Sequence, residues 1–353
     1  CSIRVGGRWV GQSDPDTNKL LTGDDSHMAY ETEDHDIQYC FPAINSSCIK
    51  GKRSSHEYNI IYVVVSLLSA WTVFLNLLVI LSISHFKKLH TPTNLIIFSL
   101  AVADLLIGLV MPIEATRLIE MCWYFGDTFC GLYSIFIWML LSASLSNLVL
   151  IAIDRYVAVC HPLLYPQKIT MTKTLISICL IWACSSTYNT SFVINNGYFD
   201  IPRKIHMCYG ECSVLVGFAW RVTDLFMCFI IPCILIISLY LRIFYVVHQQ
   251  VKVINTLMKG GKCVNEATVR KKSESKAALT LGIIVTVYLL LNTVISFKIV
   301  RFLLWIVYFY LGLNPLVYAL FYRWFKVSVK DILTLKIFHT ASLLSLTDYN
   351  QSL

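Results

Sequence analysis

The sequence predicts an all-α membrane protein, a bundle of seven transmembrane helices followed by a short amphipathic helix. Hydrophobic residues make up 56% of its 353 residues and charged residues only 14%, which is more apolar than one soluble core of this size requires. Apolar runs of about twenty residues, enough to cross a bilayer, recur along the chain. Six runs are clear and a seventh is marginal; the six lie at 59–83, 93–116, 129–153, 174–194, 215–245 and 302–322, and the seventh at 277–297.

These spans divide the chain into a tail of residues 1–58, a transmembrane domain of residues 59–322 and a second tail of residues 323–353. If the first tail is outside, more than half of the 29 Lys and Arg residues fall in the loops and tail on the other side. Basic loops face the cytoplasm, so we expect a multi-pass protein of the cell membrane with an extracellular N-terminus. The net charge of +8 then reflects topology and contact with membrane lipids, and it does not indicate nucleic-acid binding.

The first tail is polar and acidic, and it contains the sequon Asn45-Ser46-Ser47, so we expect glycosylation at Asn45. The sequons at Asn189, inside a span, and at Asn350, on the cytoplasmic side, are not expected to be used. No apolar signal-peptide core precedes the first span, and Cys1 stands where an initiator Met would. We expect natural translation to begin at Met28 and the first span to act as the insertion signal.

Polar and punctuating residues occur inside the spans, where lipid accepts them only for packing, for a kink or for function. The second span contains Asp104, and the third ends in Asp154-Arg155-Tyr156. Packing or a kink accounts for Asn76 in the first span, Trp182 in the fourth and Pro232 in the fifth. Further landmarks are Tyr240 in the fifth span and Asn314-Pro315-Leu316-Val317-Tyr318 in the last.

Taken together and in this order over residues 59–335, these landmarks resemble the rhodopsin-like G-protein-coupled receptors. Four local runs are similar to those of trace amine-associated receptors: His85–Asn94, Cys122–Asp127, Glu274–Gly282 and Tyr318–Tyr322. The resemblance implies a receptor of the fish olfactory branch, which detects amine odorants, coupled to a stimulatory G protein. An enzyme is not expected, because no nucleophile–base set, nucleotide loop or metal-ligand spacing stands out in the spans.

The resemblance also assigns roles at the cytoplasmic end. Arg155 pairs with Asp154, beside Tyr156, and with Glu274, and it is read as a switch that holds the helix ends closed until a G protein binds. Two tyrosines and the Asn-Pro pair of the last span would support the released form; they are Tyr240, Tyr318, Asn314 and Pro315. The alternative is that Arg155 only anchors its helix to lipid headgroups.

A sodium site is the one cofactor that the resemblance raises. The family holds the ion with the residues that correspond to Asp104, Ser144 and Asn314. Two further oxygen donors usually precede the Asn-Pro pair, but this chain has Tyr310 and Leu311 in that stretch. A sodium ion here would lack two ligands, and no other cofactor is expected.

An ammonium ion inside a dry bundle needs a carboxylate in contact and aromatic faces around it. Most amine receptors of this family carry the aspartate seven residues after the disulfide cysteine of the third span, where this chain has Ile137. A subset of the fish receptors carries an aspartate eight residues before the proline of the fifth span, which corresponds to Asp224. The resemblance therefore implies a single anchor, suited to a monoamine, with Ile137 as an apolar neighbour and Trp305 and Tyr308 as aromatic partners.

Two alternatives accompany this interpretation. Arg221 precedes Asp224 by three residues and could neutralise it within the helix. Trp305 and Tyr308 are equally consistent with interfacial belt residues. Tyr308 also stands where an opsin would need its Schiff-base lysine, which argues against a retinal pigment.

The cysteines and segment six complete the interpretation. The resemblance implies disulfides between Cys130 and Cys212 and between Cys48 and Cys208, with Cys40 as a competitor for Cys208 and no evident partner for Cys122. An amphipathic helix from Trp324 to Leu335 should dock through Phe325, Val329 and Ile332. After Leu290 the chain lacks the family's Cys-Trp-x-Pro run, so the alternative function is an inserted receptor-like protein that does not signal.

Overall fold

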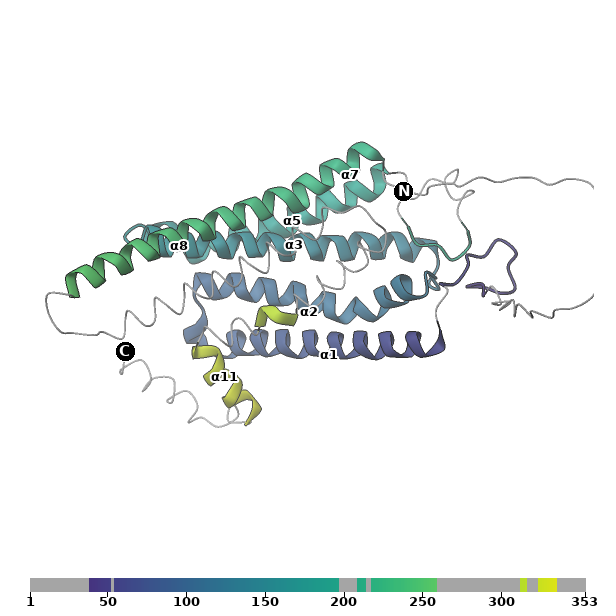
Figure 1. Cartoon of the computed structure of the whole chain (residues 1–353), viewed down its shortest axis with the longest axis horizontal. Helices are drawn as coiled ribbons and strands as arrows, with labels where there is room; N and C mark the ends of the chain where they lie inside the picture. The colour runs from purple at the N-terminus through teal and green to yellow at the C-terminus, as the bar shows by residue number, and fades with distance from the viewer. Residues whose placement is uncertain are drawn as a thin grey trace, which may run out of the picture. The chain divides into compact units, whose positions relative to one another are not determined.

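The structure is a computed structural model that describes residues 38–51, 54–196, 208–213, 217–258, 312–315 and 323–334. The described part is helical, and its only β pairing consists of isolated bridges. The helical elements are α1 (Ser55–His85), α2 (Pro92–Ile119), α3 (Asp127–Cys160), α5 (Met171–Asn195), α7 (Phe218–Asp224), the π-helical turn η2 (Leu225–Ile230), α8 (Ile231–Met258) and α11 (Arg323–Leu333), with short turns η1 (Lys87–Leu89) and α4 (Tyr165–Lys168). In Figure 1 the long helices α1, α2, α3, α5 and α8 run roughly lengthwise, whereas the short α11 is steeply inclined to them.

Five predicted spans coincide with described helices: α1, α2, α3, α5 and the continuous run from α7 to α8. Within the described residues, four helical runs are long and apolar enough to cross a membrane: Ser55–His85, Pro92–Arg117, Asp127–Cys160 and Phe218–Lys252. The predicted span 277–297 lies outside the described residues, and 302–322 is described only over 312–315.

Helices α1, α2 and α5 begin shortly before their predicted apolar runs, and each starts at a polar cap. The Ser54 hydroxyl accepts a hydrogen bond from the Glu57 N–H, and the Thr170 hydroxyl accepts one from the Lys173 N–H. The Thr91 hydroxyl accepts one from the Asn94 N–H, and Pro92 is the first residue of that helix. Such caps stabilise a helix by about 1 kcal/mol each.

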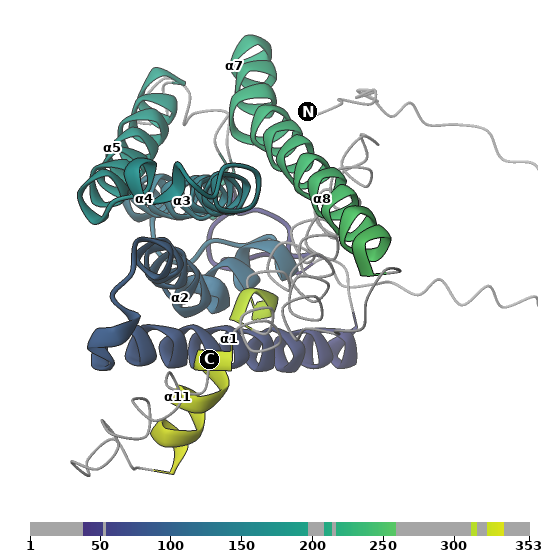
Figure 2. The ribbon, with the colours of Figure 1, turned by 90° about the vertical axis from the view of Figure 1, so that its left-hand side faces the viewer.

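Helix α3 is the central element, since it packs on α2, α5 and α8, while α1 packs on α2 (Figure 2). Small and polar residues allow these close approaches, as is usual between membrane helices. The Ser69 hydroxyl donates to the Gly108 carbonyl at 2.7 Å, and the Trp182 indole N–H donates to the Ser99 hydroxyl at 3.0 Å. A Cβ at Gly108 would lie 3.1 Å from Val73, so a larger residue there would push α1 and α2 apart.

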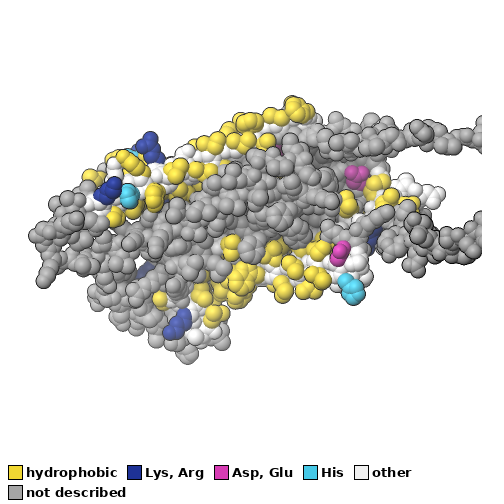
Figure 3. All heavy atoms as spheres, viewed as in Figure 1, with side chains coloured by type: hydrophobic (Ala, Val, Ile, Leu, Met, Phe, Trp, Pro, Cys, Tyr) yellow, Lys and Arg dark blue, Asp and Glu magenta, His cyan; other side chains and the backbone are white. Residues whose placement is uncertain are grey.

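Apolar side chains cover much of the visible surface of the described helices, and the visible charged side chains lie toward their ends (Figure 3). Helix α11 lies against α1. Its Phe325 and Ile332 are buried in the same apolar cluster as α1 residues, with Val329 packed beside them. The predicted docking residues of this helix are therefore confirmed, although the helix runs from Arg323 to Leu333 and not from Trp324 to Leu335.

The fifth predicted span is interrupted. The π turn Leu225–Ile230 stands directly before Pro232. Proline lacks an N–H and its ring crowds the carbonyl one turn earlier, and a wider turn relieves that crowding. The turn also changes the register between Asp224 and the rest of the span, which apolar periodicity alone does not reveal.

Candidate functional sites

Asp224 is the last residue of α7, half-buried at the start of the π turn. The Tyr188 hydroxyl of α5 donates to its Oδ1 at 3.2 Å. The Cys228 thiol, one turn further along, adjoins both groups. The side chain of Arg221 lies outside the described residues, so the alternative intrahelical pair is not tested. Both described neighbours are neutral groups, so none of the contacts among the described residues compensates the carboxylate charge.

An aromatic cluster adjoins this carboxylate. The ring of Phe192 lies 6.3 Å from that of Tyr188, 5.3 Å from Trp138 and 5.8 Å from Trp220, with centroid distances and angles typical of attractive aromatic pairs. The four rings come from α3, α5 and α7. Sequence reasoning missed them, although the spacing of four between Tyr188 and Phe192 and between Trp220 and Asp224 would place each pair on one helix face.

The residues predicted to accompany the anchor are only partly described. Ile137 is buried, 3% exposed, in an apolar cluster that also contains Tyr133 and the disulfide cysteine Cys212. Trp305 and Tyr308 lie outside the described residues. The described aromatic faces near Asp224 are therefore those of the cluster around Phe192.

A further carboxylate, Glu114 of α2, is buried and was not singled out from the sequence. It is 2% exposed and accepts the Tyr133 hydroxyl at 3.0 Å and the Arg117 guanidinium at 3.1 Å. Arg117 in turn donates to the Cys212 carbonyl at 3.3 Å. Arg117 compensates this charge, and the pair ties α2 and α3 to the segment around Cys212.

Three disulfides gather at one end of the bundle: Cys130–Cys212 and Cys48–Cys208, the two pairs that the resemblance implies, and Cys40–Cys122. The third pair corrects the expectation that Cys40 competes for Cys208 and that Cys122 has no partner. Residues 39–49 fold back on themselves, with a bridge between Tyr39 and Ile49. This turn directs Cys40 toward Cys122, 5.6 Å away between Cα atoms, and leaves Cys48 for Cys208.

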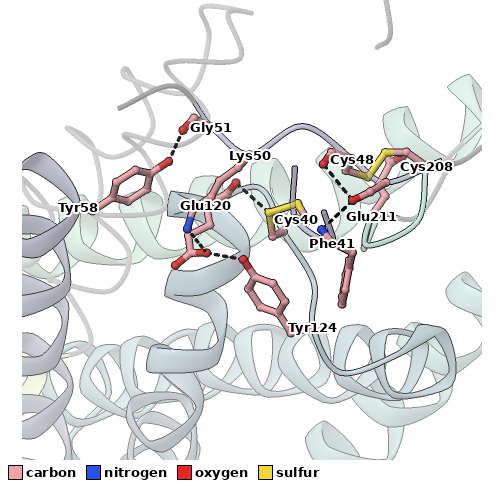
Figure 4. The surroundings of a disulfide bond; sticks show 12 residues. Cys40, Phe41, Cys48, Lys50, Gly51, Tyr58, Glu120, Tyr124, Cys208 and Glu211 are labelled. Carbon is pink, nitrogen blue, oxygen red and sulfur yellow. Dashed lines mark hydrogen bonds and ion pairs between the residues drawn. A yellow bond between two sulfur atoms is a disulfide. The ribbon is translucent and has the colours of Figure 1, made fainter. Parts of the chain in front are cut away.

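Two of the disulfides, Cys40–Cys122 and Cys48–Cys208, join three segments into one layer, called the lid here and made of residues 38–51, 122–123 and 208–212 (Figure 4). The third, Cys130–Cys212, ties the lid to α3. Backbone hydrogen bonds reinforce it, including those from Cys48 to Tyr209 at 3.0 Å and from Trp123 to Gly210 at 2.8 Å. Gly210 has a φ of +93°, and a Cβ there would lie 2.9 Å from the Phe41 ring, so the lid requires glycine at this position. Asn45 is exposed in the lid, whereas Asn189 is buried.

At the opposite end of the bundle, Asp154 is 1% exposed and receives several hydrogen bonds. Arg155 donates to its Oδ2 at 3.0 and 2.6 Å, the Thr93 hydroxyl to the same oxygen at 3.0 Å, and the Tyr165 hydroxyl to Oδ1 at 3.1 Å. Partial burial, aided by the Asp154 carboxylate, raises the pKa of the Tyr165 phenol, so it remains a donor at neutral pH. Thr93 and Tyr165 were not predicted as partners of Asp154, because only the fold brings the first turn of α2 and the short helix α4 to this carboxylate.

The other residues predicted at this end are placed as follows. Tyr156 is half-buried with its ring 5.5 Å from that of His161, and Tyr240 is buried, 8% exposed, in the apolar cluster of α8. Glu274 and Tyr318 lie outside the described residues. A pairing of Arg155 with Glu274 is therefore not tested.

Asp104 is fully buried between the two ends. The Ser144 hydroxyl donates to Oδ1 and the Asn314 amide to Oδ2, both at 2.7 Å. These three residues are the ones predicted for a sodium site. Both carboxylate oxygens already accept a hydrogen bond, Asn314 presents its N–H₂ and not its oxygen, and Leu311 carries no oxygen on its side chain. The arrangement fits a hydrogen-bonded link between α2, α3 and the Asn314-Pro315 segment better than it fits a cation.

The described helices and the buried polar residues between them define the class of protein: a multi-helix membrane protein. The family model of the 7 transmembrane receptor (rhodopsin family) matches residues 75–318. The matched stretch includes the Asp104, Asp154-Arg155 and Asn314-Pro315 landmarks.

The chain is also similar to individual receptors along most of its length. It is 36% identical over 337 residues to trace amine-associated receptor 13c of Danio rerio, covering 89% of this chain and 98% of that protein. It is 37% identical to trace amine-associated receptor 9 of Rattus norvegicus and 35% identical to trace amine-associated receptor 9 of Homo sapiens, each over 87% of this chain and over 96% and 93% of those proteins. The chain belongs to the trace amine-associated receptors of the rhodopsin family.

Proposed function

We propose that this receptor detects monoamines and that Asp224 holds the ammonium group of the ligand. The observation that carries the proposal is the carboxylate itself. Asp224 lies in an apolar span, and its described neighbours, Tyr188 and Cys228, are neutral. A carboxylate within a bundle is costly unless a cation pairs with it.

The surroundings of Asp224 suit an organic ammonium ion. The rings of Phe192, Trp138 and Trp220 supply faces for the alkyl or aryl part of the ligand and for cation–π attraction. The position where the family usually places its aspartate is the buried, apolar Ile137. With one carboxylate in place of two, the site favours one ammonium group over two, so we assign monoamines and not diamines.

The orientation follows from the chemistry of the two ends. Disulfides form outside the cytosol, so the lid, with exposed Asn45 as its glycosylation site, lies on the extracellular side of the cell membrane. The Asp154 end then faces the cytoplasm, where basic loops meet lipid headgroups. Release of Arg155 from Asp154 would open this end to a stimulatory G protein, with Tyr156, Tyr240, Tyr318, Asn314 and Pro315 supporting the change. The proposed function is therefore that of an olfactory amine receptor and not of an enzyme.

The comparisons support a receptor over the alternative of an inserted protein that does not signal, since nearly the whole length of known receptors is matched. A panel of monoamines on cells that express the full chain tests the proposal. We expect cyclic AMP to rise with at least one monoamine and not with the alcohol of the same carbon skeleton. A receptor present at the surface that answers no amine, or that answers alcohols equally, would contradict the proposal.

The hydrogen bond from Tyr165 to Asp154 leads to a prediction about basal activity. Tyr165→Phe removes a donor to an ionised carboxylate, an interaction of about 1.5 kcal/mol, from the closed arrangement of Arg155. We expect ligand-independent cyclic AMP to rise several-fold at an unchanged surface level. Tyr245→Phe, an exposed tyrosine of α8, is the matched control and should leave basal cyclic AMP at the wild-type value. Equal basal levels in both variants would show that Tyr165 does not hold the closed form.

A further inference from the structure

Glu120, at the end of α2 beside the lid, accepts hydrogen bonds or an ion pair from three segments. The Tyr62 hydroxyl of α1 donates to its Oε1 at 2.6 Å, and the Tyr124 hydroxyl donates to its Oε2 at 2.6 Å. The Lys50 ammonium of the lid lies 3.0 Å from the same Oε2 (Figure 4). The carboxylate is thus surrounded by two phenols and one ammonium ion.

The Lys50 ammonium has a second partner. It lies over the ring of Tyr58, 5.3 Å from the ring centroid, within the range of a cation–π contact. A carboxylate on one side and an aromatic face on the other are the two groups that proteins use to bind organic ammonium ions. The side chain of Lys50 is an alkylammonium ion with a four-carbon stem, so the lid shows such an ion in place.

The carboxylate of Glu120 is suited to hold a cation. Partial burial alone would raise its pKa, but the hydrogen bonds from Tyr124 and Tyr62 and the Lys50 ammonium together lower the pKa below its usual value. Glu120 therefore stays ionised at neutral pH. The side chains of Lys50 and Glu120 are 27% and 15% exposed, so a small ion from solution can reach them.

Lys50 can leave this position without unfolding the lid. Its backbone N–H donates to the Gln38 carbonyl at 2.8 Å, and the Gly51 N–H donates to the Glu120 carbonyl at 2.9 Å. The disulfides at Cys40 and Cys48 fix the same segment. Because a partly exposed ion pair contributes little to stability, an outside ammonium ion can compete with the Lys50 side chain.

We infer that Tyr58, Tyr62, Glu120 and Tyr124 form a second ammonium-binding site, called the lid cage here, which takes primary alkylammonium ions and which Lys50 fills from within. The site does not include Asp224 and does not depend on the function proposed for it. It gives the outer surface of the receptor a weak amine site beside the lid, with Lys50 as an intramolecular competitor.

The test uses the full-length receptor purified in detergent, with Asp224→Asn in every sample so that the anchor in the bundle cannot contribute. Lys50→Met is expected to lower the thermal unfolding midpoint by about 2 °C. n-Butylammonium chloride should restore the midpoint in a saturable way at millimolar concentration, whereas sodium chloride and 1-butanol at the same concentrations should not. Ligand-observed saturation-transfer NMR of n-butylammonium gives a second measurement that needs no change in stability.

Two matched variants complete the test. Lys50→Met combined with Glu120→Gln removes the carboxylate and should abolish both the restoration and the NMR signal. Lys50→Arg keeps a tethered cation and should give at most a small fraction of the Lys50→Met signal. If n-butylammonium shows no saturable binding to Lys50→Met, or binds equally after Glu120→Gln, the contact between Lys50 and Glu120 is only a structural clasp and the inference is wrong.

Discussion

Asp224→Asn is expected to raise the concentration of monoamine that gives a half-maximal cyclic AMP response by at least about 100-fold. Neutralising one partner of a buried charge pair costs about 3–5 kcal/mol, and each 1.4 kcal/mol is a factor of ten in affinity. Asparagine has the size of aspartate, and its carbonyl oxygen can still accept the Tyr188 hydroxyl that lies 3.2 Å from Asp224. The fold and the surface level should therefore be preserved, so that the loss reports the charge.

Arg221→Gln is the control that separates the anchor from its alternative. If Arg221 neutralised Asp224 within the helix, its removal would expose the carboxylate and increase amine potency strongly. We expect potency within about threefold of wild type, a change of less than 1 kcal/mol. An Asp224→Asn receptor with wild-type potency, or an Arg221→Gln receptor with greatly increased potency, would refute the assignment.

The second large effect is expected from the disulfide between Cys40 and Cys122, which closes a separation of 82 residues. Replacing both cysteines by serine should destabilise the lid by about 3 kcal/mol and lower the thermal unfolding midpoint by several degrees, with less receptor at the cell surface. Both cysteines are buried, so each replacement also places a polar hydroxyl in an apolar setting.

The single variants make this test specific. Cys40→Ser, Cys122→Ser and the double variant should have nearly the same midpoint, since each removes the same bond. Cys184→Ser, at an exposed free cysteine of α5, should leave the midpoint unchanged. If the decreases in midpoint of the two single variants add up in the double variant, the two cysteines act separately and the pairing is wrong.

Much of the fold could be predicted from the sequence because its causes are local. Apolar runs fix the spans, Ser54 and Thr91 cap two of them, and the apolar face of Phe325, Val329 and Ile332 predicts how α11 docks. Landmarks such as Asp104 could be located because a carboxylate inside a span is rare.

The remaining features depend on contacts between distant segments. Cys40 meets Cys122 only because the tail folds back, and Tyr165 meets Asp154 only through the loop after α3. Glu114 also lies inside a predicted span, so the signal that located Asp104 could have located it; only its contact with Tyr133, nineteen positions away on the next helix, depends on the fold. The π turn before Pro232 leaves no apolar signature, so the surroundings of Asp224 could not be predicted from helical periodicity.

The most direct test of the account is an experimental structure of the receptor with an activating monoamine bound. The account predicts the amine nitrogen about 2.7–3.2 Å from a carboxylate oxygen of Asp224, with the carbon skeleton against the rings of Phe192 and Trp138. A nitrogen paired instead with Glu114, or a carboxylate of Asp224 bonded to Arg221 with the ligand elsewhere, would contradict it.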